Sequence, residues 1–235
     1  MKPLLIIALI LSWQMLNAQS NVFTTAENTK NPGILDAYDL SGNAIPTGKQ
    51  ADVKGSPMLS EQFINGTVRF ANGKLYNGVL NLSLTENQLH FKKDNTEMLF
   101  AVEVKDFSLK LDENGKTTEA YFKSGYPSIG VNTGKSFYRV LSAGSKIELL
   151  KYEYKLAEEV YHYGGPSERV YGLREKLFVY DIATQKISEI GYGAKSIKKT
   201  FPSYAEIIDK IINEKGLNLK HEEDIIQLVD ALNNQ

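Results

Sequence analysis

Cysteine is absent from all 235 residues of this chain. The protein can therefore form no disulfide and no thiolate metal site. A bacterial lipoprotein anchor needs a cysteine at the cleavage site, so lipid attachment by that route is excluded as well. Tryptophan is nearly absent, because Trp13 is the only one in the chain.

A strong charge of either sign is also missing. The chain has 27 basic and 28 acidic residues, which gives a formal net charge of −1. Such a balance does not attract nucleic acid or an anionic membrane. Histidine is scarce: the chain has only His90, His162 and His221. No two of them have the sequence spacing of metal ligands. We therefore expect no metal, no cofactor and no nucleic-acid partner.

The first 18 residues have the pattern of a cleavable secretory signal peptide. Lys2 is followed by the apolar run Leu4–Leu11, and Ala18 is a small residue at the expected cleavage position. The apolar stretch is too short to span a bilayer and is interrupted by Ser12, Gln14 and Asn17. No later run approaches that length. The sequence thus predicts a periplasmic or secreted bacterial protein that lacks a transmembrane segment after cleavage.

The mature chain begins with a segment that has few large apolar residues. Residues 19–55 are rich in Asn, Thr, Gly and Ser, so they can bury little surface. We expect a flexible or irregular N-terminal segment there, followed by one β-rich domain over residues 56–235. The length after residue 55 suits a single domain.

Alternating apolar residues and turn dipeptides predict strands from Gly66 onward. Leu80, Leu82 and Leu84 alternate on one face, and Asn72-Gly73 and Asn114-Gly115 are strong hairpin signals. Further turns fall at Gly144-Ser145, Gly164-Gly165-Pro166 and Ala183-Thr184. Roughly nine short strands result, which favours an antiparallel meander in a mainly β fold, with a curved sheet or partial barrel.

After Gly193 the apolar spacing becomes helical. One helix is predicted between Pro202-Ser203 and Gly216, with Ile207, Ile208 and Ile211 on one face. A second runs from Glu222 to the end, and its apolar residues are Ile225, Leu228, Val229 and Leu232. We expect two amphipathic helices, within about residues 196–235, to pack on the sheet.

Three motifs fail a check of their spacing or context. Residues 130–136 resemble a phosphate-binding loop, but one residue is missing between the glycines and a strand follows. Asp112 to Gly115 resembles the start of a calcium loop, yet its glycine comes too early. Glu158-Glu159 is a pair of acids expected to face solvent. No catalytic residue is assigned.

Tyrosine offers the best candidates for ligand contact. Tyr152 and Tyr154 lie on one face of a predicted strand and can form a stacking platform for sugar or peptide. Tyr161, His162 and Tyr163 precede the Gly164-Gly165 loop, which makes His162 the histidine best placed for a function. His90 alternates with the apolar Leu89 and Phe91, so we expect it to face solvent.

Three long segments resemble a family of exported proteins of unknown function from Gram-negative bacteria. The segments are residues 54–57 (KGSP) followed by 65–84 (NGTVRFANGKLYNGVLNLSL), residues 136–156 (SFYRVLSAGSKIELLKYEYKL) and residues 198–233. The resemblance covers about residues 54–235 and consists of turns, strand patterns and helix faces. It implies export and architecture, and it implies no activity.

The preferred function class is a non-enzymatic binding or envelope-associated protein. Its partner would be an envelope protein, a peptide or an apolar small molecule, because a curved sheet closed by helices can enclose an apolar cavity. A secreted hydrolase that uses acidic residues in a cleft is one alternative. A structural cell-surface protein with an exposed edge strand is the other.

Overall fold

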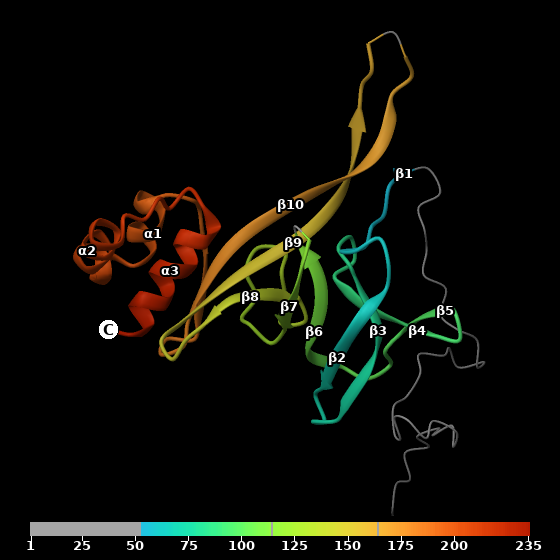
Figure 1. Ribbon diagram of the computed structural model, residues 1–235, viewed down its shortest axis with the longest axis horizontal. Helices are drawn as coiled ribbons and strands as arrows, with labels where there is room; N and C mark the ends of the chain where they lie inside the picture. Colours follow the sequence, from blue (N-terminus) through green and yellow to red (C-terminus); the bar gives the residue numbers. More distant parts are fainter. Residues whose placement is uncertain (1–52, 114, 164) are drawn as a thin grey trace, which may run out of the picture.

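The computed structural model describes residues 53–113, 115–163 and 165–235. The predicted signal peptide and almost all of the predicted N-terminal segment lie outside these residues. The described part is mainly β, with eleven strands in one open, mixed sheet and helices at the C-terminus (Figure 1). The predicted fold class is therefore confirmed.

Six antiparallel strands form the first part of the sheet. They are β2 (Ile64–Phe70), β3 (Leu75–Ser83), β4 (Gln88–Lys93), β5 (Thr96–Leu99), β6 (Val104–Glu113) and β7 (Lys116–Lys123). Their spatial order is β7-β6-β2-β3-β4-β5. The predicted hairpin at Asn72-Gly73 is confirmed, and Gly73 supplies the positive φ of 81° that this turn needs.

One face of these strands forms the first hydrophobic core. The alternating residues Leu80 and Leu82 are buried there, as the sequence predicts, with Leu109 opposite. Aromatic rings fill the space between them, since Phe91 stacks on Phe100 at 4.4 Å and Phe107 on Phe122 at 4.8 Å. The alternation leaves the other face of β3, β4 and β5 mainly to polar side chains, with Leu75, Val79 and Leu99 among them.

The sheet continues through β8 (Tyr138–Ala143), β9 (Ile147–Val160), β10 (Glu168–Asp181) and β11 (Lys186–Ile190). β9 and β10 pair over their whole length and run from the helices to a free tip (Figure 1). Their outer part, residues 152–163 and 165–176, is called the arm below. β1 (Val53–Lys54) pairs with β10 in parallel, although these two residues were expected in the irregular segment and the sheet was expected to be antiparallel.

The two long strands present two different faces. Tyr152, Tyr154, Leu156 and Val160 lie on one side, called the tyrosine face, because alternate residues of a strand share a side. Lys151, Glu153, Lys155 and Ala157 lie on the other, called the groove face. Near the base, the groove face continues into the buried Leu149, Leu177 and Val179, on which the helices pack.

The C-terminal segment folds as α1 (Ala194–Thr200), the 3-10 turn η1 (Pro202–Tyr204), α2 (Ala205–Lys215) and α3 (Glu222–Asn233). The two predicted helices are confirmed, and Gly216 ends α2 in the left-handed conformation, with φ 66°. α1 was missed because it buries only Ile197 and therefore shows no apolar stripe. Among the described residues, no helix has the length and apolar character that crossing a bilayer requires.

Candidate functional site

A groove of about 1050 Å³ separates the polar face of β3–β5 from the groove face of the arm. Its floor includes Asn81 of β3, His90 of β4 and Glu97 of β5. The arm contributes Lys155 and Ala157 from β9, with Arg169 and Tyr171 from β10. Residues 55–63, called the covering segment, run along the groove between β1 and β2. The site therefore combines strands that lie far apart in the sequence.

His90 is the most unusual residue of the groove floor. Strand pairing sets His90 beside Asn81 on β3 and beside Leu99 on β5. The histidine is only 2% exposed, so the expectation of a solvent-facing His90 is wrong. The alternation placed His90 correctly on the face opposite Leu89 and Phe91. That face is itself covered, which the local pattern does not reveal.

Glu97 fixes the orientation of the His90 ring. Its Oε1 lies 2.8 Å from His90 Nδ1. When the ring is neutral, Nδ1 donates its proton to this carboxylate and Nε2 keeps a free lone pair. Nε2 is buried and has no hydrogen-bond partner among the described residues. A buried polar atom without a partner costs about 1–3 kcal/mol, which marks Nε2 as a place where a ligand group could bind.

The covering segment is held by polar contacts from two sides. Asn81 is 1% exposed, and its amide nitrogen donates to the carbonyl oxygens of Ser60 at 2.8 Å and Gln62 at 3.2 Å. From the arm, Lys155 Nζ donates to the carbonyl oxygens of Ser56 at 2.9 Å and Met58 at 2.6 Å. Burial lowers the pKa of Lys155. These contacts tie the arm to the first part of the sheet.

Tyr152 and Tyr154 lie on the same side of β9, the tyrosine face, as the sequence predicts. Their rings stack with centroids 5.7 Å apart. Tyr152 also contacts the buried Tyr138, at 5.5 Å between centroids, so the base of this face belongs to the protein interior. Further out, Leu156 is 52% exposed. The face therefore leads from the interior toward solvent as a row of aromatic and apolar side chains up to Leu156, followed by Glu158.

The other three predicted contact residues lie at the tip of the arm. Tyr161 is 77% exposed and Tyr163 is fully exposed. The Tyr161 hydroxyl donates to Glu159 at 2.9 Å, and His162 Nε2 lies 3.2 Å from Glu168. Glu168 also pairs with Lys54, and these contacts hold the pKa of its carboxyl below the usual range. The five candidates thus share one arm but form two groups, one on the tyrosine face and one at the tip.

The charged side chains of the arm are mostly paired within the protein. Arg174 lies 2.6 Å from Glu158 on the tyrosine face, and Lys176 lies 3.0 Å from Glu189 of β11. Glu158 and its neighbour Glu159 alternate to opposite faces, so they do not form the facing pair of acids that glycoside hydrolysis requires. What the arm leaves without a partner is its apolar and aromatic surface.

Glu153 is a mostly buried acid that faces a second acid at the base of the arm. It lies directly opposite Glu175 in the strand pairing, with Lys151 nearby. Burial raises the pKa of Glu153, and its Oε2 has no hydrogen-bond partner within the described chain. Lys151 is used elsewhere, because its Nζ donates to Glu222 of α3 at 2.9 Å.

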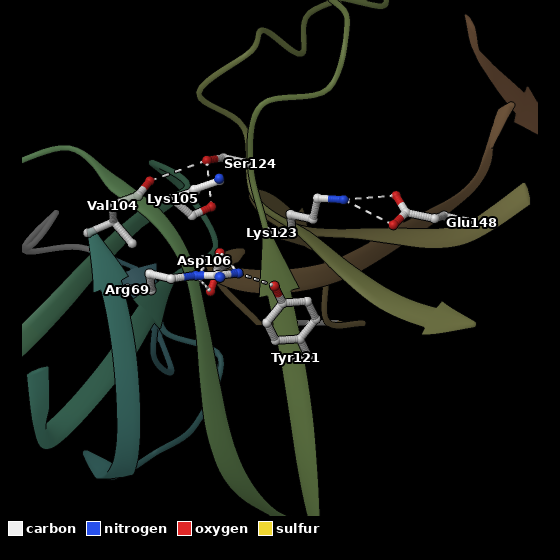
Figure 2. A network of polar contacts seen from close by, with 8 residues as sticks. All are labelled: Arg69, Val104, Lys105, Asp106, Tyr121, Lys123, Ser124 and Glu148. Atoms are coloured by element: carbon white, nitrogen blue, oxygen red, sulfur yellow. Dashed lines mark hydrogen bonds and ion pairs between the residues drawn. The ribbon is translucent and has the colours of Figure 1, made fainter. Parts of the chain in front are cut away.

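A separate polar network connects β2, β6 and β7 with the inner end of β9 (Figure 2). Arg69 donates two hydrogen bonds to Asp106, at 2.9 and 3.1 Å from Nε, and lies 3.4 Å from the Tyr121 hydroxyl. Lys123 of β7 donates to both oxygens of Glu148 on β9, at 3.0 and 3.1 Å. Each charge faces an opposite one, so we interpret this network as structural.

The loop and the following strand that the sequence predicts around residues 130–141 are present in the structure. Residues 130–136 lie in the loop before β8, where Ile129 and Asn132 form a bridge and the Asn132 amide donates to the Tyr138 hydroxyl at 2.9 Å. A strand follows this loop, as expected. Within the described ranges, no group of three or more His, Cys, Asp or Glu side chains is arranged to hold a metal ion.

The chain matches no protein-family model, no curated protein and no solved structure. Its resemblance to exported proteins of Gram-negative bacteria remains a prediction from sequence segments. The site therefore has to be interpreted from its own geometry.

Proposed function

We propose that this is an exported, non-enzymatic protein that binds a partner protein in the bacterial envelope through its arm. The observation behind the proposal is the exposed apolar surface of a ribbon that extends away from the rest of the sheet (Figure 1). A two-stranded ribbon is marginally stable in water on its own. Exposed Tyr161 and Tyr163 suit a protein contact, since tyrosine is enriched in interfaces.

Partner binding is better supported than self-assembly through the edge of the sheet. The outer edge of β10 has β1 paired at 169–170 and β11 at 177–181, and no described strand pairs with the stretch between them. That stretch includes Arg174, Glu175 and Lys176. Consecutive charges on an open edge oppose association with a second strand. The apolar contact surface of the arm is the tyrosine face and the tip instead.

The groove gives little support to binding of an apolar small molecule or to a hydrolase. An apolar ligand is disfavoured, because it would cover exposed charged side chains of the lining, such as Glu61 and Arg169, without replacing their contacts with water. Hydrolysis by two facing acids is also disfavoured. Glu97 is occupied by His90, and Glu153, the acid whose pKa is raised by burial, is not part of the groove lining.

Photo-crosslinking in the native host tests the arm. A benzophenone amino acid at Tyr163 is expected to give one discrete adduct, whereas the same residue at Lys215, exposed on α2, is expected to give none. Leu156→Asp on the tyrosine face should suppress the adduct. Leu173→Asp is the matched control, because Leu173 is 50% exposed on the opposite face. Equal loss in both variants, or no adduct at Tyr163, would refute binding by the tyrosine face.

Export is tested separately by the mass of the mature protein. Protein from the periplasm or the medium is expected to begin at or near Gln19, after cleavage following Ala18. An intact-mass measurement that finds residues 1–18 still attached in the envelope fraction would contradict the predicted signal peptide.

A further inference from the structure

We propose that the groove is a second binding site, and that it recognises a saccharide through hydrogen bonds centred on His90. This site lies on the groove face of the arm, opposite the tyrosine face, so it goes beyond the proposed partner binding. Four observations point to a hydroxyl-rich ligand. The Nε2 of His90 has no hydrogen-bond partner among the described residues, and the polar groups of the floor come mainly from side chains. The lining has no net charge, and the Tyr171 ring lies on the arm wall.

The free Nε2 of His90 calls for a hydrogen-bond donor. Glu97 holds the opposite ring nitrogen at 2.8 Å, which leaves Nε2 as an acceptor in the neutral ring. The core side of β4 cannot supply a donor, because Leu89 and Phe91 fill it. Asn81 cannot supply one either, since its amide contacts the covering segment. Nε2 is closed to solvent in the free protein, so a donor reaches it only from the groove side, after a local shift of the lining, and a sugar hydroxyl fits this requirement.

The floor offers mainly side chains. It is the face of β3, β4 and β5; the main-chain groups of β3 and β4 are paired on both edges, whereas β5, at the end of the sheet, pairs with β4 alone among the described strands. An extended peptide binds to a sheet mainly by adding main-chain hydrogen bonds at an edge. A ligand on the floor itself meets polar side chains, among them Gln62, Thr85 and Glu86, beside apolar ones such as Phe63 and Val79. A sugar, which has hydroxyls on its edges and apolar C–H faces, suits this mixture.

The lining has no net charge and includes one tyrosine. Its acids are Glu61, Glu86 and Glu97, and its bases are Lys92, Lys155 and Arg169. A balanced lining does not select a phosphate or a polyamine. On the arm wall, Tyr171 presents a ring that can pack on the apolar face of a sugar and a hydroxyl that can bond to it. The volume of the groove, about 1050 Å³, is large enough for a short oligosaccharide.

NMR of the histidine side chains tests the proposal directly. The chain has three histidines, so His162 at the tip and His221 before α3 serve as internal controls. Titration with maltotriose, cellotriose and chitotriose is expected to shift the Nε2 signal of His90 with at least one sugar. The signals of His162 and His221 should stay in place. No shift at His90 with any of the three sugars, or a shift with trialanine alone, would overturn the proposal.

Substitutions separate recognition from folding. Tyr171→Leu is expected to weaken binding of the responding sugar about tenfold, as loss of one good contact would. Tyr154→Leu makes the same change on the tyrosine face and should leave sugar affinity unchanged. His90→Gln should weaken binding to a similar extent, with circular dichroism as the check on folding. Equal affinity in the Tyr171 and Tyr154 variants would refute the groove as the binding site, whatever the crosslinking of the arm shows.

Discussion

At the scale of single residues, Glu153 is the clearest example of a side chain that opposes stability. It faces Glu175 across the ribbon, and burial raises its pKa above the usual 4.5. A carboxyl with a raised pKa in the folded state favours folding while it is protonated, below the pKa of the unfolded chain. That contribution is lost as the pH rises through the raised pKa.

Glu153→Gln is therefore expected to stabilise the protein at neutral pH. The gain in melting temperature should shrink as the pH falls and should vanish below about pH 4.5, where both side chains are neutral. Thermal melts at several pH values measure this directly. Glu103→Gln, at an exposed acid between β5 and β6, is the control and should change little at any pH. A gain that does not depend on pH would contradict the burial argument.

The sequence predicted which side of a strand a residue occupies better than it predicted how buried that residue is. Tyr152 and Tyr154 share a side because alternation is a local property of any strand. His90 was placed on the correct face by the same rule, yet its burial was missed. The neighbouring Asn81 on the same face is covered by residues 55–63, which belong to a segment with no strong pattern. Burial of this kind depends on contacts between distant segments.

At the scale of elements, the arm is expected to become less stable toward its tip. Near the base, β9 pairs on both sides, with β8 and with β10. Beyond Lys155, whose backbone N–H donates to the Leu84 carbonyl oxygen at 3.0 Å, β9 pairs with β10 alone among the described strands. Backbone amides with fewer packed neighbours open at lower free energy.

Hydrogen exchange measures this gradient. The amides of Leu149 and Leu150 are expected to exchange slowly, and those from Ala157 to Val160 much faster. Binding of the proposed partner should slow exchange in the outer stretch alone. Uniform protection along β9 in the free protein would contradict an arm that is held mainly at its base.

The C-terminal helices depend on their contact with the sheet. Ile208, Ile211, Leu228 and Val229 are buried, as the helical spacing predicted. Helices of 11 and 12 residues are marginal in water without such packing. Ile211→Ala or Leu228→Ala should each cost about 2–5 kcal/mol, measured by denaturant unfolding. Lys215→Ala, on the polar side of α2, should stay within about 0.5 kcal/mol.

At the scale of the whole molecule, one sheet supports separate hydrophobic cores. One lies under β2–β7, and another joins the base of β8–β11 to the helices. The junction between these parts is narrow, since β7 and β8 pair only through Phe122–Arg139 and Lys123–Tyr138. Local patterns predicted the strands and helices on each side. The parallel β1–β10 pairing joins Val53 to Arg169 and could not be predicted from neighbouring residues.

Deleting residues 201–235 tests how strongly the two parts depend on each other. The deletion exposes Leu149, Leu177 and Val179, so the amides at the base of β9 and β10 should lose protection from exchange. The amides of β2–β7 should lose much less, because their core lies on the other side of the narrow junction. Unchanged protection of β9 and β10 would show that the helices are a detachable appendage.

The ribbon of β9 and β10 also has the mechanical form of a lever. Fourteen residues in each strand span roughly 46 Å, with the helices at one end and Tyr161 near the other. The pivot is Lys155, which touches Leu84 through its backbone and the covering segment through its ammonium group. The inner limb, from Lys155 back to Ile147, is held by β8 and by the helical core, so a sideways load on the tip acts against those contacts. That limb ends on α3 through Lys151 and Glu222, so tension applied outside the fold is transmitted to its last helix.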